Sequence, residues 1–262
     1  MGKVIAITGK GGTGKTAVTA IIIRSLLKRD KKTTILAIDA DPDANLADAL
    51  GDDVEMTVGD IREEIQDSRV SLPPDYDKKQ LFAAKIFEAL LEKDGYDLLV
   101  MGRSEGSGCY CYLNSLLKGI MDETIDDYDL VLVDSPAGLE HLSRKTISEV
   151  DSLIVVTDES RRGLKTAETI RQLADELDLK YGNLYVIANK VHDLSKDQIL
   201  KVASGLGLKV IGMIPYDENV ARLDLVGDPL VGLPDDSPAV VEVEEHIIKE
   251  IGLEGRSIWE RN

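Results

Sequence analysis

The sequence predicts a three-layer α/β fold, in which a mainly parallel sheet carries helices on both faces. Short aliphatic runs alternate with segments whose apolar residues recur at helical spacing, as parallel strands buried on both faces require. Hydrophobic residues make up 43% of the 262 residues but aromatic residues only 4%, which indicates an aliphatic core. A chain of this length fits one large α/β domain, so we expect a single domain over residues 1–262.

The first predicted strand, Val4–Ile7, leads into a glycine-rich loop and then into helical spacing from Ala17 to Leu27. The loop Gly9–Thr16 fits the pattern G-x-x-x-x-G-K-[ST] in its required strand–loop–helix context. Lys15 can reach the β- and γ-phosphates of a nucleotide, and the Thr16 hydroxyl can ligate Mg²⁺. Glycines let the backbone wind closely around phosphate oxygens, and the residues expected to bind them are Gly11, Gly12, Thr13, Gly14, Lys15 and Thr16.

Acidic turns follow the second predicted strand, Thr34–Ile38, and a later strand, Leu130–Val133. Asp39 and Asp41 stand in the first turn, and Asp134 opens the second, which reads DSPAG. An acidic strand end alone is most often a solvated one. In combination with the phosphate-binding loop, the two turns favour a nucleotide site.

The rest of the chain continues the alternation of strands and helices. We expect strands at 98–101, 153–156, 184–187 and 210–214, helices at 164–177 and 195–205, and an amphipathic final helix at 240–251. The less regular segment from Asp52 to Tyr96 is interpreted as an insertion that carries one helix, at 79–92, and not as a separate domain. The dipeptides Asn189-Lys190 and Pro215-Tyr216 follow the strands 184–187 and 210–214.

Charge and cysteine content exclude several classes of protein. The chain has 31 Lys and Arg against 48 Asp and Glu, a net charge of −17, which argues against nucleic-acid and anionic membrane partners. No apolar run approaches the roughly 18–20 residues of a membrane-spanning helix. Two cysteines cannot form a disulfide framework, so we expect a cytoplasmic protein.

The two cysteines, Cys109 and Cys111, are separated by a single residue in the stretch GSGCYCY. A disulfide across one residue is strained, whereas a thiolate pair is a good soft ligand set for Ni²⁺, Zn²⁺, Cu⁺ or an iron–sulfur cluster. Two thiolates do not complete a four-coordinate site. A twofold homodimer would bring two pairs together as four thiolates, which suit tetrahedral Zn²⁺ or tetragonal Ni²⁺.

The loop sequence KGGTGKT resembles the deviant P-loop of the nitrogenase iron protein, MinD and ParA, which are dimerising P-loop NTPases of the SIMIBI type. The resemblance implies that Lys10 crosses a nucleotide-sandwich dimer to touch the partner's phosphates, as an arginine finger does in trans. It also implies that Asp41 positions or deprotonates the attacking water. Asp39 would support the Mg²⁺ shell, and Asp134 would hold Mg²⁺ through water.

The same resemblance implies how the base is bound. The Asn189 amide would contact adenine, and Pro215 would frame the other edge of the purine. His192 stands where G proteins carry their specificity aspartate, so guanine is disfavoured and ATP or ADP is expected.

Two further stretches resemble the accessory ATPases of the CooC type, which assist nickel insertion into carbon monoxide dehydrogenase. They are the segment CYCYLNS, which begins at Cys109, and AGLEHLSR, which follows Asp134 at 137–144. This resemblance implies an ATP-hydrolysing, homodimeric metallochaperone with Ni²⁺ or Zn²⁺ at Cys109 and Cys111. Its client would be carbon monoxide dehydrogenase or acetyl-CoA synthase.

Three alternatives remain at this level. An iron–sulfur reductase like the nitrogenase iron protein takes its cysteines from separate loops, one of them shortly after the second acidic turn, and residues 134–148 contain none. A MinD- or ParA-type positioning ATPase acts on membrane or DNA, which the charge of −17 disfavours. A metal chaperone with a vestigial nucleotide site is disfavoured by the retained site residues, namely Lys15, Thr16, Asp39, Asp41 and Asp134.

Overall fold

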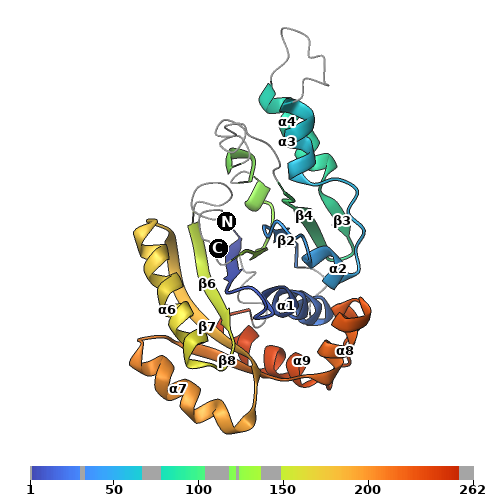
Figure 1. The fold of residues 1–262 in the computed structure, drawn as a ribbon. Helices are drawn as coiled ribbons and strands as arrows, with labels where there is room; N and C mark the ends of the chain where they lie inside the picture. Colours follow the sequence, from blue (N-terminus) through green and yellow to red (C-terminus); the bar gives the residue numbers. More distant parts are fainter. Residues whose placement is uncertain are drawn as a thin grey trace.

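The computed structural model describes residues 2–29, 33–66, 78–103, 118–121, 124–136 and 149–253. These residues form an eight-stranded sheet in the order β3-β4-β2-β5-β1-β6-β7-β8, drawn in Figure 1. Every neighbouring pair is parallel except β3 and β4. The strands are β1 (Lys3–Thr8), β2 (Ile35–Asp39), β3 (Leu91–Lys93), β4 (Tyr96–Val100), β5 (Leu130–Asp134), β6 (Glu149–Thr157), β7 (Lys180–Val191) and β8 (Val210–Pro215).

Helices cover both faces of this sheet, so the three-layer, mainly parallel α/β fold is confirmed. In β1, Val4 and Ala6 enter one hydrophobic cluster, whereas Ile5 and Ile7 enter the other. The first cluster takes side chains from α3 (Val58–Gln66), α4 (Lys78–Glu88), α6 (Arg161–Glu176) and α7 (Lys196–Gly205). The second takes them from α1 (Lys15–Arg29), α2 (Leu46–Leu50), α8 (Glu218–Val226) and the C-terminal helical segment. Short 3₁₀ turns lie at Asp193–Ser195 and Leu230–Gly232.

One expectation about the segment 52–96 is wrong in its details. The predicted helix 79–92 ends at Glu88, and the chain then forms the antiparallel hairpin of β3 and β4. Asp94-Gly95 makes the two-residue turn, with Gly95 at a φ of 97° that glycine adopts without strain. The segment also carries α3, which packs against α4, so its described residues, 52–66 and 78–96, hold two helices where one was expected.

The predicted final helix, 240–251, is present but has three parts. α9 (Pro238–Glu242) continues into a π-helical turn, Val243–Ile247, and then into α10 (Ile248–Glu250). Its apolar side chains at Val240, Val243, Ile247 and Ile251 are buried in the second cluster. The amphipathic pattern therefore predicts the buried face correctly.

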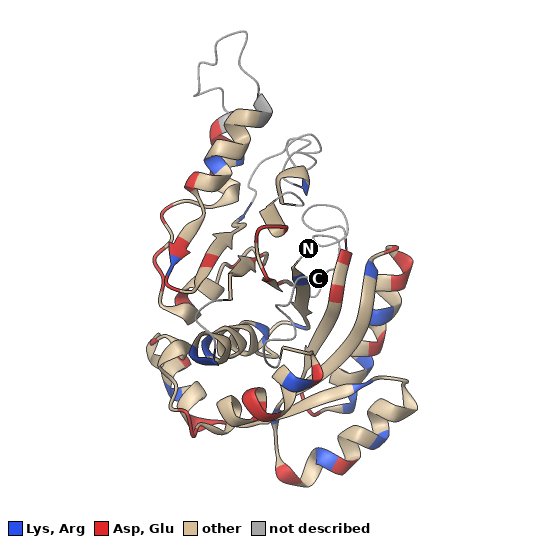
Figure 2. Ribbon diagram, turned by 180° about the vertical axis from the view of Figure 1, so that it is seen from behind, with Lys and Arg blue, Asp and Glu red and all other residues tan. Residues whose placement is uncertain are grey.

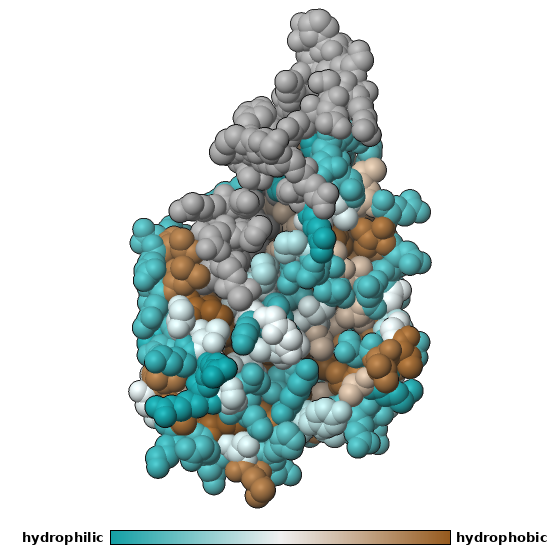
Figure 3. All heavy atoms as spheres, viewed as in Figure 1, coloured by the Kyte–Doolittle hydropathy of each residue, from teal (hydrophilic) through white to brown (hydrophobic). Residues whose placement is uncertain are grey.

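The described surface on the face seen in Figure 3 is mostly hydrophilic. Figure 3 shows hydrophilic atoms over most of the visible described face, with hydrophobic atoms in separate small patches. In Figure 2, both basic and acidic residues lie along α6 and α7. Among the described residues, no helix has the length and apolar character needed to cross a membrane.

The sheet topology brings the acidic turns and the glycine-rich loop to one edge. β5 lies between β2 and β1, and all three run in the same direction. In this register Asp134 stands opposite both Ile7 and Asp39. Because the carboxyl ends of parallel strands meet at one edge, the three loops that follow these strands converge there.

Candidate nucleotide-binding site

The glycine-rich loop joins β1 directly to α1, and its shape depends on glycine at a defined position. Gly14 has a φ of 85°, and a Cβ atom there would lie 2.4 Å from Nδ2 of Asn189. Thr13 tightens the loop, because its N–H and its hydroxyl both donate to the Lys10 carbonyl, at 3.3 and 2.8 Å. α1 begins at Lys15, so the free N–H groups of its first turn face this loop.

Asp134 lies at the end of β5, and only one of its two carboxylate oxygens accepts a hydrogen bond from the described residues. Thr16 Oγ1 donates to Asp134 Oδ2 at 2.6 Å, whereas the buried Oδ1 has no hydrogen-bond partner among the described groups. Burial raises the pKa of Asp134 to about 7; the Thr16 hydrogen bond opposes the rise, and the nearby Asp39 carboxylate adds to it. A hydroxyl and a buried carboxylate oxygen without a partner are oxygen ligands of the kind that Mg²⁺ prefers.

Asp39 stands beside Asp134 but is engaged differently. Its Oδ1 accepts from the backbone N–H of Asp41 at 3.1 Å, and its Oδ2 accepts from the backbone N–H of Leu46 at 2.8 Å. The residue is fully buried, and burial raises its pKa to about 6, although these two hydrogen bonds oppose the shift. Both oxygens therefore already serve main-chain groups.

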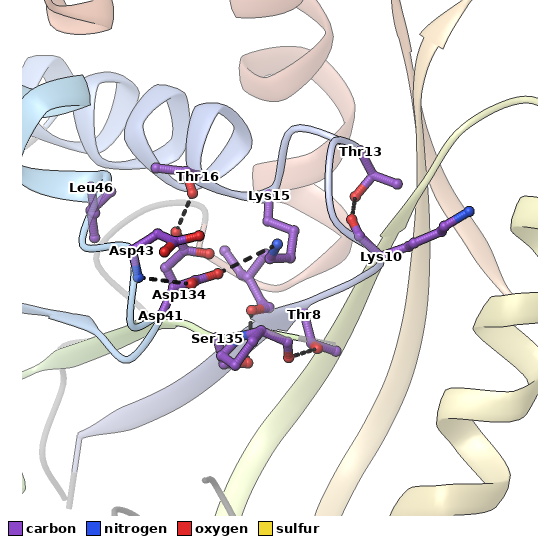
Figure 4. Close-up of polar contacts among 12 residues, drawn as sticks. Thr8, Lys10, Thr13, Lys15, Thr16, Asp41, Asp43, Leu46, Asp134 and Ser135 are labelled. Carbon is purple, nitrogen blue, oxygen red and sulfur yellow. Dashed lines mark hydrogen bonds and ion pairs between the residues drawn. The ribbon is translucent and has the colours of Figure 1, made fainter. Parts of the chain in front are cut away.

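Lys15 lies among these carboxylates, as Figure 4 shows. Its Nζ atom is 3.8 Å from Asp41 Oδ2, and the lysine side chain is only 9% exposed. Asp41 Oδ1 in turn accepts from the N–H of Asp43 at 3.2 Å. A phosphate group bound to the loop would compete with Asp41 for the buried ammonium.

Lys10 extends away from this cluster. Figure 4 shows its ammonium on the side of the loop opposite Asp41 and Asp134. The side chain is exposed, and the described part of the chain offers it no ion-pair partner. The two lysines of the loop are therefore directed differently, Lys15 inward and Lys10 outward.

Asn189 lies behind the loop at the end of β7. Its Nδ2 donates to the Thr13 carbonyl at 2.8 Å, and its Oδ1 accepts from the N–H of Lys190 at 2.9 Å. Lys190 adopts a φ of 59°, and its Nζ lies 3.4 Å from the Gly12 carbonyl. The expected base-contact residue thus also fixes the glycine-rich loop.

A cavity of about 810 Å³ runs from the loop to α8. This volume lies within the range of sites for small molecules and cofactors. The sequence-predicted residues that line it are Gly11, Gly12, Gly14, Lys15, Thr16, Asp41, Asn189 and Pro215. The Thr13 side chain instead donates back to the loop, at the Lys10 carbonyl. Asp39 and Asp134 are fully buried and do not line the cavity.

Sequence reasoning missed the α8 wall of this cavity, which includes Val220 and Leu225. The available signal was Asp217, whose side chain accepts from the N–H of Asn219 at 2.8 Å and so caps α8. The same carboxylate accepts from the Ser237 hydroxyl and from the N–H of Ala239, at 3.0 Å for the latter. Asp217 therefore joins the starts of α8 and α9 beside the cavity.

The expected metal ligands Cys109 and Cys111 lie outside the described residues, as do Gly138 and the stretch 137–144. Within the described ranges, no group of three or more His, Cys, Asp or Glu side chains is arranged to hold a metal ion. The inter-subunit thiolate site thus stays a prediction from the sequence.

The fold and the site together define a P-loop ATPase whose loop carries a second lysine. The family model for the CobQ/CobB/MinD/ParA nucleotide-binding domain matches residues 4–230. The chain belongs to this family of ATP-binding proteins.

Individual relatives agree with this assignment. An uncharacterised ATP-binding protein of Methanocaldococcus jannaschii is 50% identical over 92% of this chain and 96% of its own length. The carbon monoxide dehydrogenase accessory protein CooC of Rhodospirillum rubrum is 34% identical over 85% of this chain and 87% of its own. Among solved structures, the MinD cell division protein of Aquifex aeolicus is 25% identical, with a TM-score of 0.71 over 97% of this chain and 98% of its own.

Proposed function

We propose that the protein is an ATP-hydrolysing, dimerising metallochaperone that assists nickel insertion into carbon monoxide dehydrogenase or acetyl-CoA synthase. The observation that carries the proposal is the 34% identity to CooC of Rhodospirillum rubrum over most of both chains. The Cys109-x-Cys111 pair adds a soft ligand set of the kind that nickel binds. In this proposal residues 1–262 act as one domain in the cytoplasm, without nucleic-acid or membrane partners.

The geometry of the cavity supports a role in ATP hydrolysis. The backbone N–H groups of the glycine-rich loop would hold the phosphates, and Lys15 would move from Asp41 to the β- and γ-phosphates. Mg²⁺, when bound by Thr16 and Asp134, would neutralise charge on the phosphate oxygens. Asp41 would then be free to orient the attacking water.

The outward direction of Lys10 supports a role across a dimer interface. Because Lys10 points away from Asp41 and Asp134 of its own chain, its ammonium would be available to the phosphates bound by a second copy. The same twofold arrangement would bring two Cys109-x-Cys111 pairs together as a site for Ni²⁺ or Zn²⁺.

Reconstitution of a client enzyme tests this function. Nickel-free carbon monoxide dehydrogenase is incubated with limiting Ni²⁺ and ATP, with and without the purified protein, and CO oxidation is measured. A parallel series uses acetyl-CoA synthase and its own activity. We expect activation that requires ATP and is lost with the Lys15→Ala variant or with Cys109→Ser and Cys111→Ser together. No activation of either client would contradict the proposal.

A positioning role of the MinD type is the second candidate, because the fold is similar to that of MinD of Aquifex aeolicus at a TM-score of 0.71. The charge of −17 disfavours anionic surfaces. ATP-dependent recruitment to liposomes of anionic lipid, or salt-sensitive DNA binding, would favour this candidate. An iron–sulfur chromophore in anaerobically purified protein would instead favour a reductase resembling the nitrogenase iron protein.

A further inference from the structure

The Asp39 carboxylate closes the loop that joins β2 to α2. Its two oxygens reach the two ends of that loop: Oδ1 accepts from the N–H of Asp41, and Oδ2 accepts from the N–H of Leu46. Leu46 is the first residue of α2. One side chain therefore fastens the start of the loop and the helix that follows it.

Backbone hydrogen bonds to the neighbouring strands hold Asp39 in place. β2 lies between β4 and β5, and the Asp39 carbonyl accepts from the N–H of Met101 at 2.8 Å. The next residue, Ala40, donates its N–H to the Asp134 carbonyl, also at 2.8 Å. Asp39 is fully buried, so water does not compete for its oxygens. The position of its carboxylate is thus set by the sheet.

The loop that it closes is built around Asp41. The Asp41 carbonyl accepts from the N–H of Ala44 at 3.0 Å, and its Oδ1 accepts from the N–H of Asp43 at 3.2 Å. Ala44 adopts a φ of 51°, which an alanine adopts only when surrounding contacts hold it. Fixing the N–H of Asp41 therefore fixes the start of the turn that presents the Asp41 carboxylate to Lys15.

We propose that Asp39 is a positioning residue, which holds the loop 40–45 so that Asp41 faces the phosphate site, and not a direct ligand of Mg²⁺. The proposal rests on the proposed function for the role of Asp41. The contrast with Asp134 supports it, because Asp134 Oδ1 has no partner among the described groups, whereas both oxygens of Asp39 are occupied. Asp39 would support the Mg²⁺ shell indirectly, through the loop.

Two substitutions separate these roles by their hydrogen-bonding chemistry. Asp39→Asn keeps the size of the side chain but has one carbonyl oxygen, so its NH₂ group must face one of the two backbone N–H donors. Asp39→Ala removes both acceptors. Asp43→Asn is a matched control with the same loss of charge in the same loop, since the exposed Asp43 carboxylate contacts Arg103 and neither of these N–H groups. Circular dichroism verifies that each variant is folded.

The first measurement is amide hydrogen exchange in protein free of Mg²⁺ and nucleotide. We expect the amide that faces the NH₂ group, either Asp41 or Leu46, to exchange about tenfold faster or more in Asp39→Asn, which is the factor for one hydrogen bond to a charged acceptor. Both amides should exchange faster in Asp39→Ala, which has neither acceptor. Exchange at Leu46 should stay at the wild-type rate in Asp43→Asn. Wild-type exchange at both amides in Asp39→Asn would overturn the proposal.

The second measurement is the Mg²⁺ concentration that gives half-maximal ATP hydrolysis. We expect it to change by less than about twofold in Asp39→Asn while kcat falls, and to rise by about tenfold or more in Asp134→Asn. An equal rise in both variants would identify Asp39 as a direct ligand. If the wild-type protein does not hydrolyse ATP, the proposed function fails, and hydrogen exchange alone still decides whether Asp39 holds the loop.

Discussion

Replacing Asp134 by asparagine should stabilise the protein when Mg²⁺ and nucleotide are absent. Asp134 is fully buried, and one of its oxygens has no hydrogen-bond partner among the described groups. Burial raises its pKa from 3.8 to about 7, a difference that corresponds to about 4 kcal/mol between the charged and neutral forms. The asparagine side chain of the Asp134→Asn variant would keep the acceptor for the Thr16 hydroxyl and carry no charge at any pH.

The sign of this effect follows from linkage. A carboxyl group whose pKa is raised by folding contributes its full stability below the unfolded pKa of about 3.8, and that stability is lost as the pH rises through about 7. Relative to the wild type, Asp134→Asn should therefore gain stability between about pH 4 and pH 7, to a maximum of about 4 kcal/mol at pH 8.

Urea denaturation followed by circular dichroism, with EDTA present, measures this difference at pH 5 and pH 8. Adding Mg²⁺ and ATP at pH 8 should stabilise the wild type more than the variant, by about 1.4 kcal/mol for each tenfold loss of affinity, because the variant lacks the carboxylate that balances the cation. If Asp134→Asn were no more stable than the wild type at pH 8 in EDTA, Asp134 would not be an uncompensated buried charge, and the reasoning would be refuted.

Three further predictions concern the glycine-rich loop, the loop 40–45 and the wall of the cavity. Lys10→Ala should lower ATP hydrolysis by about a thousandfold, as for loss of an arginine finger, while nucleotide affinity stays within about threefold; full activity would refute a role in trans. Asp41→Ala should trap an ATP-bound dimer in size-exclusion chromatography, and normal turnover would remove Asp41 as the water-positioning group. Asp217→Ala should cost about 2–4 kcal/mol in urea denaturation through three lost hydrogen bonds, whereas the exposed Asp228→Ala should cost little. Burial alone would raise the pKa of Asp217, but the hydrogen bonds from Ala239 and Ser237 outweigh it and lower the pKa below its ordinary value of 3.8. The contribution of Asp217 to stability should therefore be lost as the pH falls below about 3.8.

The sheet could be predicted because its signals are local. Each parallel strand is a short aliphatic run, and the glycine-rich loop follows the first of them within a few residues. The edge strand β3 was missed because Leu91–Lys93 is too short to show a period, although Asp94-Gly95 is a recognised turn signal. The predicted helix 79–92 therefore extended into it.

The partners of the site residues could not be predicted, because they depend on the path of the chain. Asp39 is expected from its motif to lie near Mg²⁺, but its contact with Leu46 depends on how the loop returns to α2. The α8 wall of the cavity depends on how α8 packs against the 3₁₀ turn Leu230–Gly232, which in turn packs against α1, and sequence spacing does not specify this arrangement. Tertiary contacts of this kind decide which side-chain atoms remain available for a ligand.

Native mass measurement during a Ni²⁺ titration, with and without ATP, tests the proposed metallochaperone role most directly. It reports dimerisation and metal stoichiometry in a single experiment. We predict a dimer that binds one Ni²⁺, and loss of that ion when Cys109→Ser and Cys111→Ser are combined. Unchanged metal stoichiometry in the double variant, or a chain that stays monomeric with ATP and Ni²⁺ present, would contradict the account.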